Sequence, residues 1–118
     1  LAEGRVTLVR RDVQDKRPVA LAGVAGEVGE ELGEAQRRLF SEAEERRDAR
    51  TTRVGSLGEA VAAAADGFAV LSWDAIGLEG EQELAAEGAS VRCLQREDGS
   101  LASSDDEPGL QAVVARAY

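Results

Sequence analysis

The sequence predicts an α/β (α+β) fold, in which a small mixed sheet packs with helices and is preceded by a β-hairpin and a long helix. Three observations lead to this prediction. A β-branched run with a polar turn opens the chain, a helical repeat of apolar residues follows, and helix-like and strand-like segments then alternate to the end. Alternation of this kind places helices against a sheet. With 118 residues, the chain has the size of one domain or of two small units.

The first predicted element is a β-hairpin. Residues 5–11 form the run RVTLVRR, which is bounded by Gly4 and by a polar stretch over residues 12–17. Residues 18–21, PVAL, continue the chain. Two strand-like runs separated by a polar segment are typical of a hairpin.

A single long amphipathic helix is predicted over residues 24–47. Its apolar residues recur at steps of three or four, the spacing that places side chains on one helical stripe. They are Val24, Val28, Leu32, Ala35, Leu39 and Ala43. The glycines of residues 23–33 weaken the helix, each by about 0.5–1 kcal/mol relative to alanine. We therefore expect burial of the apolar stripe to compensate.

The second half of the chain is predicted to alternate between helices and strands. Ser56 and Glu59 form the Ser-x-x-Glu pattern of a capping box, which indicates the start of a helix. Gly67 follows this helix and suits a left-handed C-terminal cap. The predicted helices cover residues 57–66 and 79–87, with Gly88 ending the second, and the predicted strands cover residues 68–73, 90–95 and 111–116, with a polar connection over 96–109.

Charge is distributed unevenly along the chain. The formal net charge is −9, which argues against a general nucleic-acid binder because phosphate contacts need a positive surface. Residues 1–50 nevertheless carry 10 basic and 11 acidic side chains, whereas residues 51–118 carry 4 and 12. Any contact with RNA is therefore expected in the first part.

Two basic groups are candidates for contact with RNA phosphates. The hairpin group comprises Arg10, Arg11, Lys16 and Arg17, and the helix group comprises Arg37, Arg38, Arg46, Arg47 and Arg50. The alternative is a solvated surface balanced by neighbouring carboxylates, which are Glu34, Glu42, Glu44 and Glu45 in the helix. We favour the solvated surface for the helix, and both interpretations stay open for the hairpin.

The residue types exclude several kinds of active site. The chain has no histidine, so a Ser-His-Asp or Cys-His arrangement is impossible. Cys93 can act as a nucleophile, but a buried strand thiol is the favoured interpretation. One cysteine without histidine cannot build a structural zinc site. The acidic residues of 79–87 and 105–107 can bind a cation such as Ca²⁺, but a solvated acidic surface is favoured, so we predict no metal.

The cellular location of the protein is predicted from features that its sequence lacks. No apolar run is long enough to span a bilayer, and residues 1–11 do not have the order of a signal peptide. The lone cysteine fits a reducing compartment. These features predict a cytoplasmic protein without membrane contact.

Five segments resemble, in order, the C-terminal part of prolyl-tRNA synthetases of the archaeal/eukaryote-like type. Residues 1–12, LAEGRVTLVRRD, look like the closing hairpin of the anticodon-binding domain in that family. The QRRLF of residues 36–40 is similar to a Gln-x-x-Leu-Phe pattern in the helix that follows. The remaining three segments are GFAVLSW at 67–73, SVRCL at 90–94 and VARAY at 114–118, and they resemble an extra C-terminal domain.

The resemblance implies that residues 1–45 are the end of an anticodon-binding domain and residues 46–118 the appended domain. It implies a proline-tRNA ligase in translation, in which this part is scaffold and partial contact region for tRNA(Pro). ATP and Mg²⁺ would serve a catalytic domain outside this stretch, which itself holds no cofactor and no catalytic centre. It implies a homodimer when complete and approach of Tyr118 to the catalytic domain. The predicted tRNA contacts are Arg5, Arg10, Arg11, Lys16 and Arg17.

The resemblance has one departure, and other hypotheses remain. Some family members hold zinc with four cysteines, but the corresponding residues here, 74–83 and 97–109, contain none, so we expect a zinc-less domain. A first alternative is a free-standing module derived from a synthetase that binds tRNA or a protein partner. A second is an acidic α/β domain without a role in RNA binding.

Overall fold

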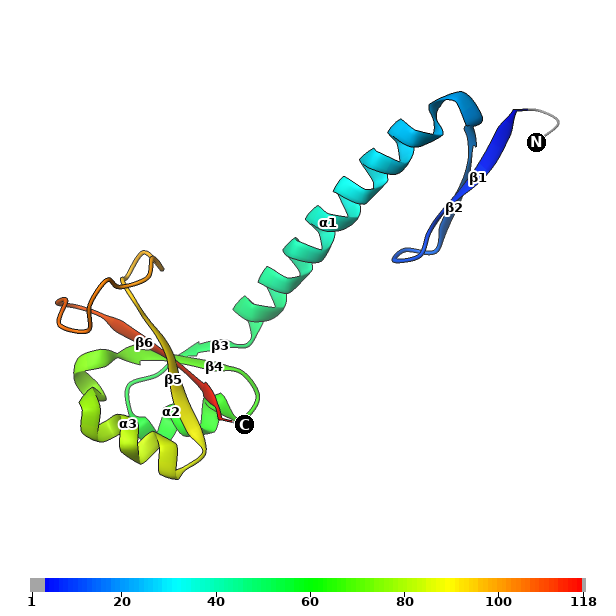
Figure 1. Cartoon of the computed structure of the whole chain (residues 1–118). Coiled ribbons are helices and arrows are strands. Elements are labelled where there is room, and N and C mark those ends of the chain that lie inside the picture. The colour runs from blue at the N-terminus through cyan, green and yellow to red at the C-terminus, as the bar shows by residue number, and fades with distance from the viewer. Residues whose placement is uncertain (1–3, 118) are drawn as a thin grey trace. The chain divides into compact units, whose positions relative to one another are not determined.

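The computed structural model describes residues 4–117, and residues 1–3 and 118 lie outside the described part. The chain divides into two units, Leu1–Glu45 and Arg46–Tyr118 (Figure 1). The first holds a hairpin and most of a long helix, and the second holds a four-stranded sheet with helices. The predicted fold class is confirmed.

The first unit begins with the predicted hairpin. Strand β1 (Arg5–Arg10) pairs antiparallel with β2 (Asp15–Ala20), and Gln14 in the turn adopts a left-handed φ of 57°. The 3-10 turn η1 (Leu21–Gly23) then leads into helix α1 (Val24–Ala49). The hairpin and the long helix are both found, but β2 begins at Asp15, inside the stretch over residues 12–17 that was predicted as the connection.

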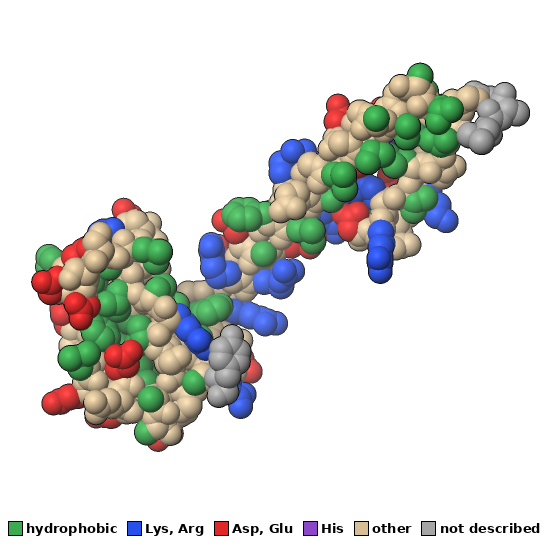
Figure 2. All heavy atoms as spheres, viewed as in Figure 1, with side chains coloured by type: hydrophobic (Ala, Val, Ile, Leu, Met, Phe, Trp, Pro, Cys, Tyr) green, Lys and Arg blue, Asp and Glu red, His purple; other side chains and the backbone are tan. Residues whose placement is uncertain are grey.

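The apolar stripe of α1 is largely exposed, contrary to our expectation of burial. No described residue of α1 is fully buried. Leu32 and Leu39 of the stripe are 67% and 56% exposed, and Phe40, which extends the apolar face beside Leu39, is 63% exposed. Figure 2 shows such apolar side chains on the surface of the hairpin and helix. The reason is that α1 meets the hairpin through the polar residues beside the stripe, as described below, and the expected compensation is not found in the described chain.

The second unit is built on one mixed sheet. Its strands are β3 (Thr51–Arg53), β4 (Phe68–Ser72), β5 (Ala89–Gln95) and β6 (Gln111–Arg116), in the order β3-β4-β6-β5. Strand β3 runs parallel to β4, whereas β6 is antiparallel to both β4 and β5. Helices α2 (Leu57–Ala64) and α3 (Gly77–Ala86) lie on one side of the sheet (Figure 1). Among the described strands, β3 was not predicted, because its three residues lie in a charged stretch.

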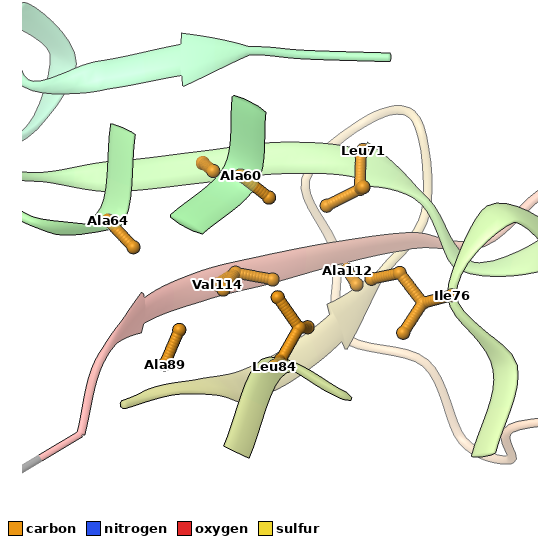
Figure 3. Packing of buried hydrophobic residues seen from close by; sticks show 9 residues of the cluster. Ala60, Ala64, Leu71, Ile76, Leu84, Ala89, Ala112 and Val114 are labelled. Carbon is orange, nitrogen blue, oxygen red and sulfur yellow. The ribbon is translucent and has the colours of Figure 1, made fainter. Parts of the chain in front are cut away.

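The core of the second unit lies between this sheet and the two helices. Leu84 of α3 and Val114 of β6 are fully buried there, and small residues surround them (Figure 3). Ala60 and Ala64 of α2 are part of the same cluster. Alanine at these positions lets the helix backbone approach the strands closely, so a modest chain builds a dense core with few large side chains.

The ends of the helices in the second unit are set by glycines and by a capping serine. Gly88 ends α3 with a φ of 75°, as predicted. Ser56 caps α2 by accepting a hydrogen bond from the Glu59 N–H at 3.3 Å, while the Glu59 carboxylate accepts from the N–H of Gly55. The prediction for Gly67 is wrong, since its φ is not left-handed. Glycine is needed there because a Cβ would lie 2.1 Å from the carbonyl oxygen of Arg50.

Candidate functional site

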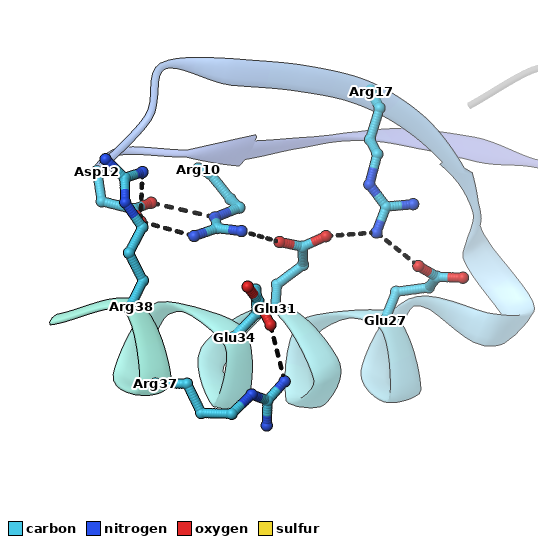
Figure 4. Close-up of polar contacts among 8 residues, drawn as sticks. All are labelled: Arg10, Asp12, Arg17, Glu27, Glu31, Glu34, Arg37 and Arg38. Atoms are coloured by element: carbon cyan, nitrogen blue, oxygen red, sulfur yellow. Dashed lines mark hydrogen bonds and ion pairs between the residues drawn. The ribbon is translucent and has the colours of Figure 1, made fainter. Parts of the chain in front are cut away.

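The hairpin is held on α1 by a charged cluster centred on Glu31 (Figure 4). Arg17 of β2 donates from Nη2 to Glu31 Oε1 at 2.7 Å and to Glu27 Oε2 at 2.7 Å. Arg10 of β1 lies 3.1 Å from the other oxygen of Glu31. Glu31 therefore joins both strands to one face of the helix. Its side chain is only 21% exposed, so water screens these pairs less than on an open surface.

A second set of contacts fixes the hairpin turn. Arg10 donates to both carboxylate oxygens of Asp12, at 3.1 and 2.7 Å. Arg38 of α1 approaches Asp12 at 3.8 Å and also donates to Glu42 at 2.8 Å. The hydrogen bond from Arg17 is the main cause that lowers the pKa of Glu31, and the one from Arg10 does the same for the pKa of Asp12. Both carboxyls are thus charged at neutral pH.

These contacts divide the basic residues that the sequence analysis selected in the hairpin. Arg10 and Arg17 face α1 and are engaged by its carboxylates and by Asp12. Arg5, Arg11 and Lys16 are exposed and have no ion pair within residues 4–117. The three exposed cations are therefore available to an external anion. Tyr118, selected for its resemblance, lies outside the described residues.

Two of the arginines selected in α1 pair with the glutamates that the sequence analysis named. Arg37 pairs with Glu34 at 2.9 Å, and Arg38 pairs with Glu42. Exposed pairs three or four residues apart support a helix by a few tenths of a kcal/mol, about 0.2–0.5. This part of α1 is therefore a solvated face in the structure.

No catalytic or metal-binding group is apparent in the described part of the chain. Cys93 is a free thiol in β5 and is half-buried rather than buried, because it borders a hollow on the sheet surface. Among residues 4–117 no cluster of three or more cysteine, aspartate or glutamate side chains is placed to hold a metal ion. No helix in the same range has the length and apolar character required to span a membrane.

Comparison with known proteins finds relatives of the chain. No family model matches it. Over its whole length it is 48% identical to the proline–tRNA ligase of Frankia casuarinae and 48% identical to proline–tRNA ligase 2 of Streptomyces avermitilis. The chain is homologous to proline–tRNA ligases. It spans 25% of the length of each of these relatives and matches their C-terminal region.

More distant proline–tRNA ligases agree with this relationship. That of Rubrobacter xylanophilus is 35% identical over the whole chain, which again spans 25% of the relative. Among solved structures, the prolyl-tRNA synthetase of Cryptosporidium parvum, complexed with L-proline and AMP, matches 99% of the chain with a TM-score of 0.74. The chain covers 26% of that structure, and at 18% identity the likeness shows the fold alone.

The loop between β5 and β6 is held by one ion pair. Arg96 donates to both oxygens of Glu107, at 2.8 and 3.0 Å. The same carboxylate accepts from the N–H groups of Ser103 and Ser104, at 2.7 and 3.2 Å. Trp73, the residue after β4, donates to the Asp105 carbonyl at 3.1 Å. Hydrogen bonds to one carboxylate thus order a polar loop.

We predict that Glu107→Gln loosens this loop. The bond from the Ser103 N–H is the main cause that lowers the pKa of Glu107, followed by Arg96. Because the pKa is lowered in the folded state, the charged carboxylate contributes its full stabilisation of the loop above the ordinary carboxyl pKa of about 4.3. This stabilisation is lost as the pH falls through the lower pKa of the folded state. Amide hydrogen exchange at Ser103 and Ser104 should become several-fold faster in the variant at neutral pH. Glu97→Gln is the control, since it removes an exposed charge in the same loop, and equal exchange in both variants would contradict the prediction.

Proposed function

We propose that the chain is part of a proline–tRNA ligase, an enzyme that joins proline to tRNA(Pro) in translation with ATP and Mg²⁺. Identity of 48% over the whole chain is the observation that carries the proposal. In this proposal the 118 residues serve as scaffold and as a partial tRNA contact, and they hold no catalytic centre. Chemistry belongs to a catalytic domain elsewhere in the enzyme, which acts as a homodimer in the cytoplasm.

The two units correspond, in the same proposal, to two domains of the ligase. Residues 1–45 are the end of an anticodon-binding domain, and residues 46–118 are the zinc-less C-terminal domain of the archaeal/eukaryote-like type. The division between Glu45 and Arg46 supports this assignment. So does the exposed stripe of α1, because Leu32, Leu39 and Phe40 have the spacing of a helix that packs on further structure. The rest of the anticodon-binding domain would cover them.

The hairpin supplies the tRNA contact in two ways. Arg5, Arg11 and Lys16 point to solvent and carry charge that nothing in the described chain neutralises, so they pair with RNA phosphates. Arg10 and Arg17 hold the hairpin on Glu31 and set its orientation. All five residues therefore remain assigned to the contact, the first three directly and the other two by positioning.

Aminoacylation by the complete ligase tests this assignment. Replacing Arg5, Arg11 and Lys16 together with glutamine should raise the KM for tRNA about tenfold and flatten its dependence on salt, since phosphate contacts release counterions. Proline-dependent pyrophosphate exchange, measured without tRNA, should stay unchanged. Arg37→Gln is a control, because Arg37 is exposed and paired only with Glu34 in the described chain. An unchanged KM in the triple variant would remove the hairpin from the tRNA contact.

A free-standing module that binds tRNA or a protein partner is the alternative. The curated relatives described above are all proline–tRNA ligases in which the matching segment is a quarter of the length. This observation does not favour a separate module.

A further inference from the structure

The sheet of the second unit has one face that neither α2 nor α3 covers. Side chains alternate between the two faces of a strand, and the core cluster takes Ala69, Leu71, Ala112 and Val114 on the helical side. The strand register then aligns two rows on the opposite side, which we call the open face. One row is Thr51, Phe68, Ala115 and Ser90, and the next is Arg53, Val70, Val113 and Cys93.

A hollow of about 410 Å³ lies on this open face. Its floor is apolar and is formed by Phe68, Val70 and Val113. Phe68 is half-buried, so part of its ring remains accessible. Arg47, from the last turn of α1, borders the hollow together with Thr51. An aromatic ring in an open hollow on a four-stranded sheet offers a flat surface to a planar ligand.

Arg47 borders the hollow, whereas Arg53 lies farther along the open face and is held across the sheet. Arg53 of β3 donates from Nη1 to Oε1 of Gln111 on β6 at 3.1 Å, so its guanidinium reaches over β4 beside Val70. Arg47 is paired with its neighbour Asp48 at 2.8 Å. Most other carboxylates of this unit belong to the helical side or to the loop over residues 96–109. Asp48 also borders the hollow, as does Gly99 of that loop. The open face therefore combines an aromatic surface with the charge of Arg53 and with the Arg47–Asp48 pair.

We propose that the open face of the sheet binds an unpaired nucleotide of RNA. The base stacks on Phe68, and Arg53 and Arg47 contact the flanking phosphates. Sequence-tolerant binding of single strands uses this pair of features, a ring that stacks and cations that follow the backbone. The identity of the RNA as tRNA(Pro) rests on the proposed function, but the surface itself is defined by residues 47–113 alone.

RNA suits this surface better than an acidic or apolar protein segment for a geometric reason. The guanidinium of Arg53 is restrained by its hydrogen bond to Gln111, which leaves donors for a phosphate at little cost in side-chain entropy. A docked protein would instead have to desolvate that cation. The test below must therefore distinguish RNA binding from docking of a protein on this face.

The test is a titration of the 118-residue chain with short unstructured RNA. The ligands are three tetranucleotides, one each of adenine, cytosine and uracil nucleotides. Methyl NMR signals of Val70 and Val113 and the ring signals of Phe68 should shift in a saturable manner. Raising the salt concentration from 50 to 200 mM should weaken binding several-fold, as phosphate contacts require. Absence of shifts at these three residues would overturn the proposal.

Variants on the two faces sharpen the test. Phe68→Leu keeps an apolar side chain but removes the stacking ring, and should weaken binding about tenfold. Arg53→Gln should weaken it several-fold and flatten the salt dependence. Arg116→Gln is the matched control, because Arg116 is an exposed arginine on the opposite, helical side of the same sheet, beside Val61 and Ala64. If Phe68→Leu fails to fold, the comparison of Arg53→Gln with Arg116→Gln still decides, and equal affinities there would overturn the proposal.

The outcome is independent of the function proposed for the hairpin. Oligonucleotide shifts confined to Arg5, Arg11 and Lys16 would support the hairpin contact and overturn binding at the sheet. Binding at the sheet in the 118-residue chain that disappears in the complete ligase would also overturn the proposal, because protein would then cover the open face. If the hairpin variants charge tRNA normally, the proposed hairpin contact is wrong, but the result of the sheet titration does not change.

Discussion

Gly67→Ala is expected to destabilise the second unit by about 3 kcal/mol, the upper end of the usual cost of overpacking. A Cβ at this position would lie 2.1 Å from the carbonyl oxygen of Arg50. That oxygen is backbone and accepts the N–H of Phe68 at 2.8 Å, at the start of the pairing between β3 and β4. It cannot move away without breaking this bond. The substitution therefore strains the strand edge that joins α1 to the sheet.

The chain contains a convenient probe and a matched control for this prediction. Trp73 is the single tryptophan and lies in the second unit, so its fluorescence reports unfolding of that unit. The melting temperature should fall by at least about 10 °C. Gly58→Ala makes the same change in α2, where nothing lies within 4 Å of the new Cβ, and should stabilise by about 0.5–1 kcal/mol. Similar melting temperatures for the two variants would show that the backbone contact at Gly67 is easily relieved.

Most elements could be predicted because their signals are local. The period of apolar residues indicates α1, and the last strand is found with the predicted bounds, Gln111–Arg116. Strand β3 was missed because Thr51–Arg53 is short and polar, and it becomes a strand only by pairing with β4. A parallel partner separated by a helix leaves no local pattern.

Gly67 shows how a correct glycine can be predicted for the wrong reason. Its place after a helix indicated a left-handed cap, which is a backbone conformation of that one residue. The structure instead requires glycine because Arg50, which precedes β3, comes close in space. A contact between segments so far apart in sequence cannot be inferred from either segment alone.

The candidate site was predictable in composition but not in arrangement. The five basic residues of the hairpin have equal standing in the sequence, and only the fold turns Arg10 and Arg17 toward Glu31. Glu27 and Glu31 were part of the helical pattern without any sign of their partners. The open face of the sheet was missed altogether, since Arg53 and Phe68 come onto one face only through the pairing of β3 with β4, which places Thr51 beside Phe68 and Arg53 beside Val70.

Leu84→Ala should cost about 3–4 kcal/mol, because it removes a fully buried side chain from the core of the second unit. Its neighbours Ala60 and Ala64 are too small to fill the space by changing rotamers, so most of the cavity would remain. Denaturation followed by Trp73 fluorescence should show a lower midpoint with an unchanged slope. Leu78→Ala, on the same helix but 69% exposed, should change stability by less than about 0.5 kcal/mol. A small loss of stability in Leu84→Ala would mean that α3 can shift toward the sheet and fill the cavity. The dense packing of the alanine-lined core would then not depend on this leucine.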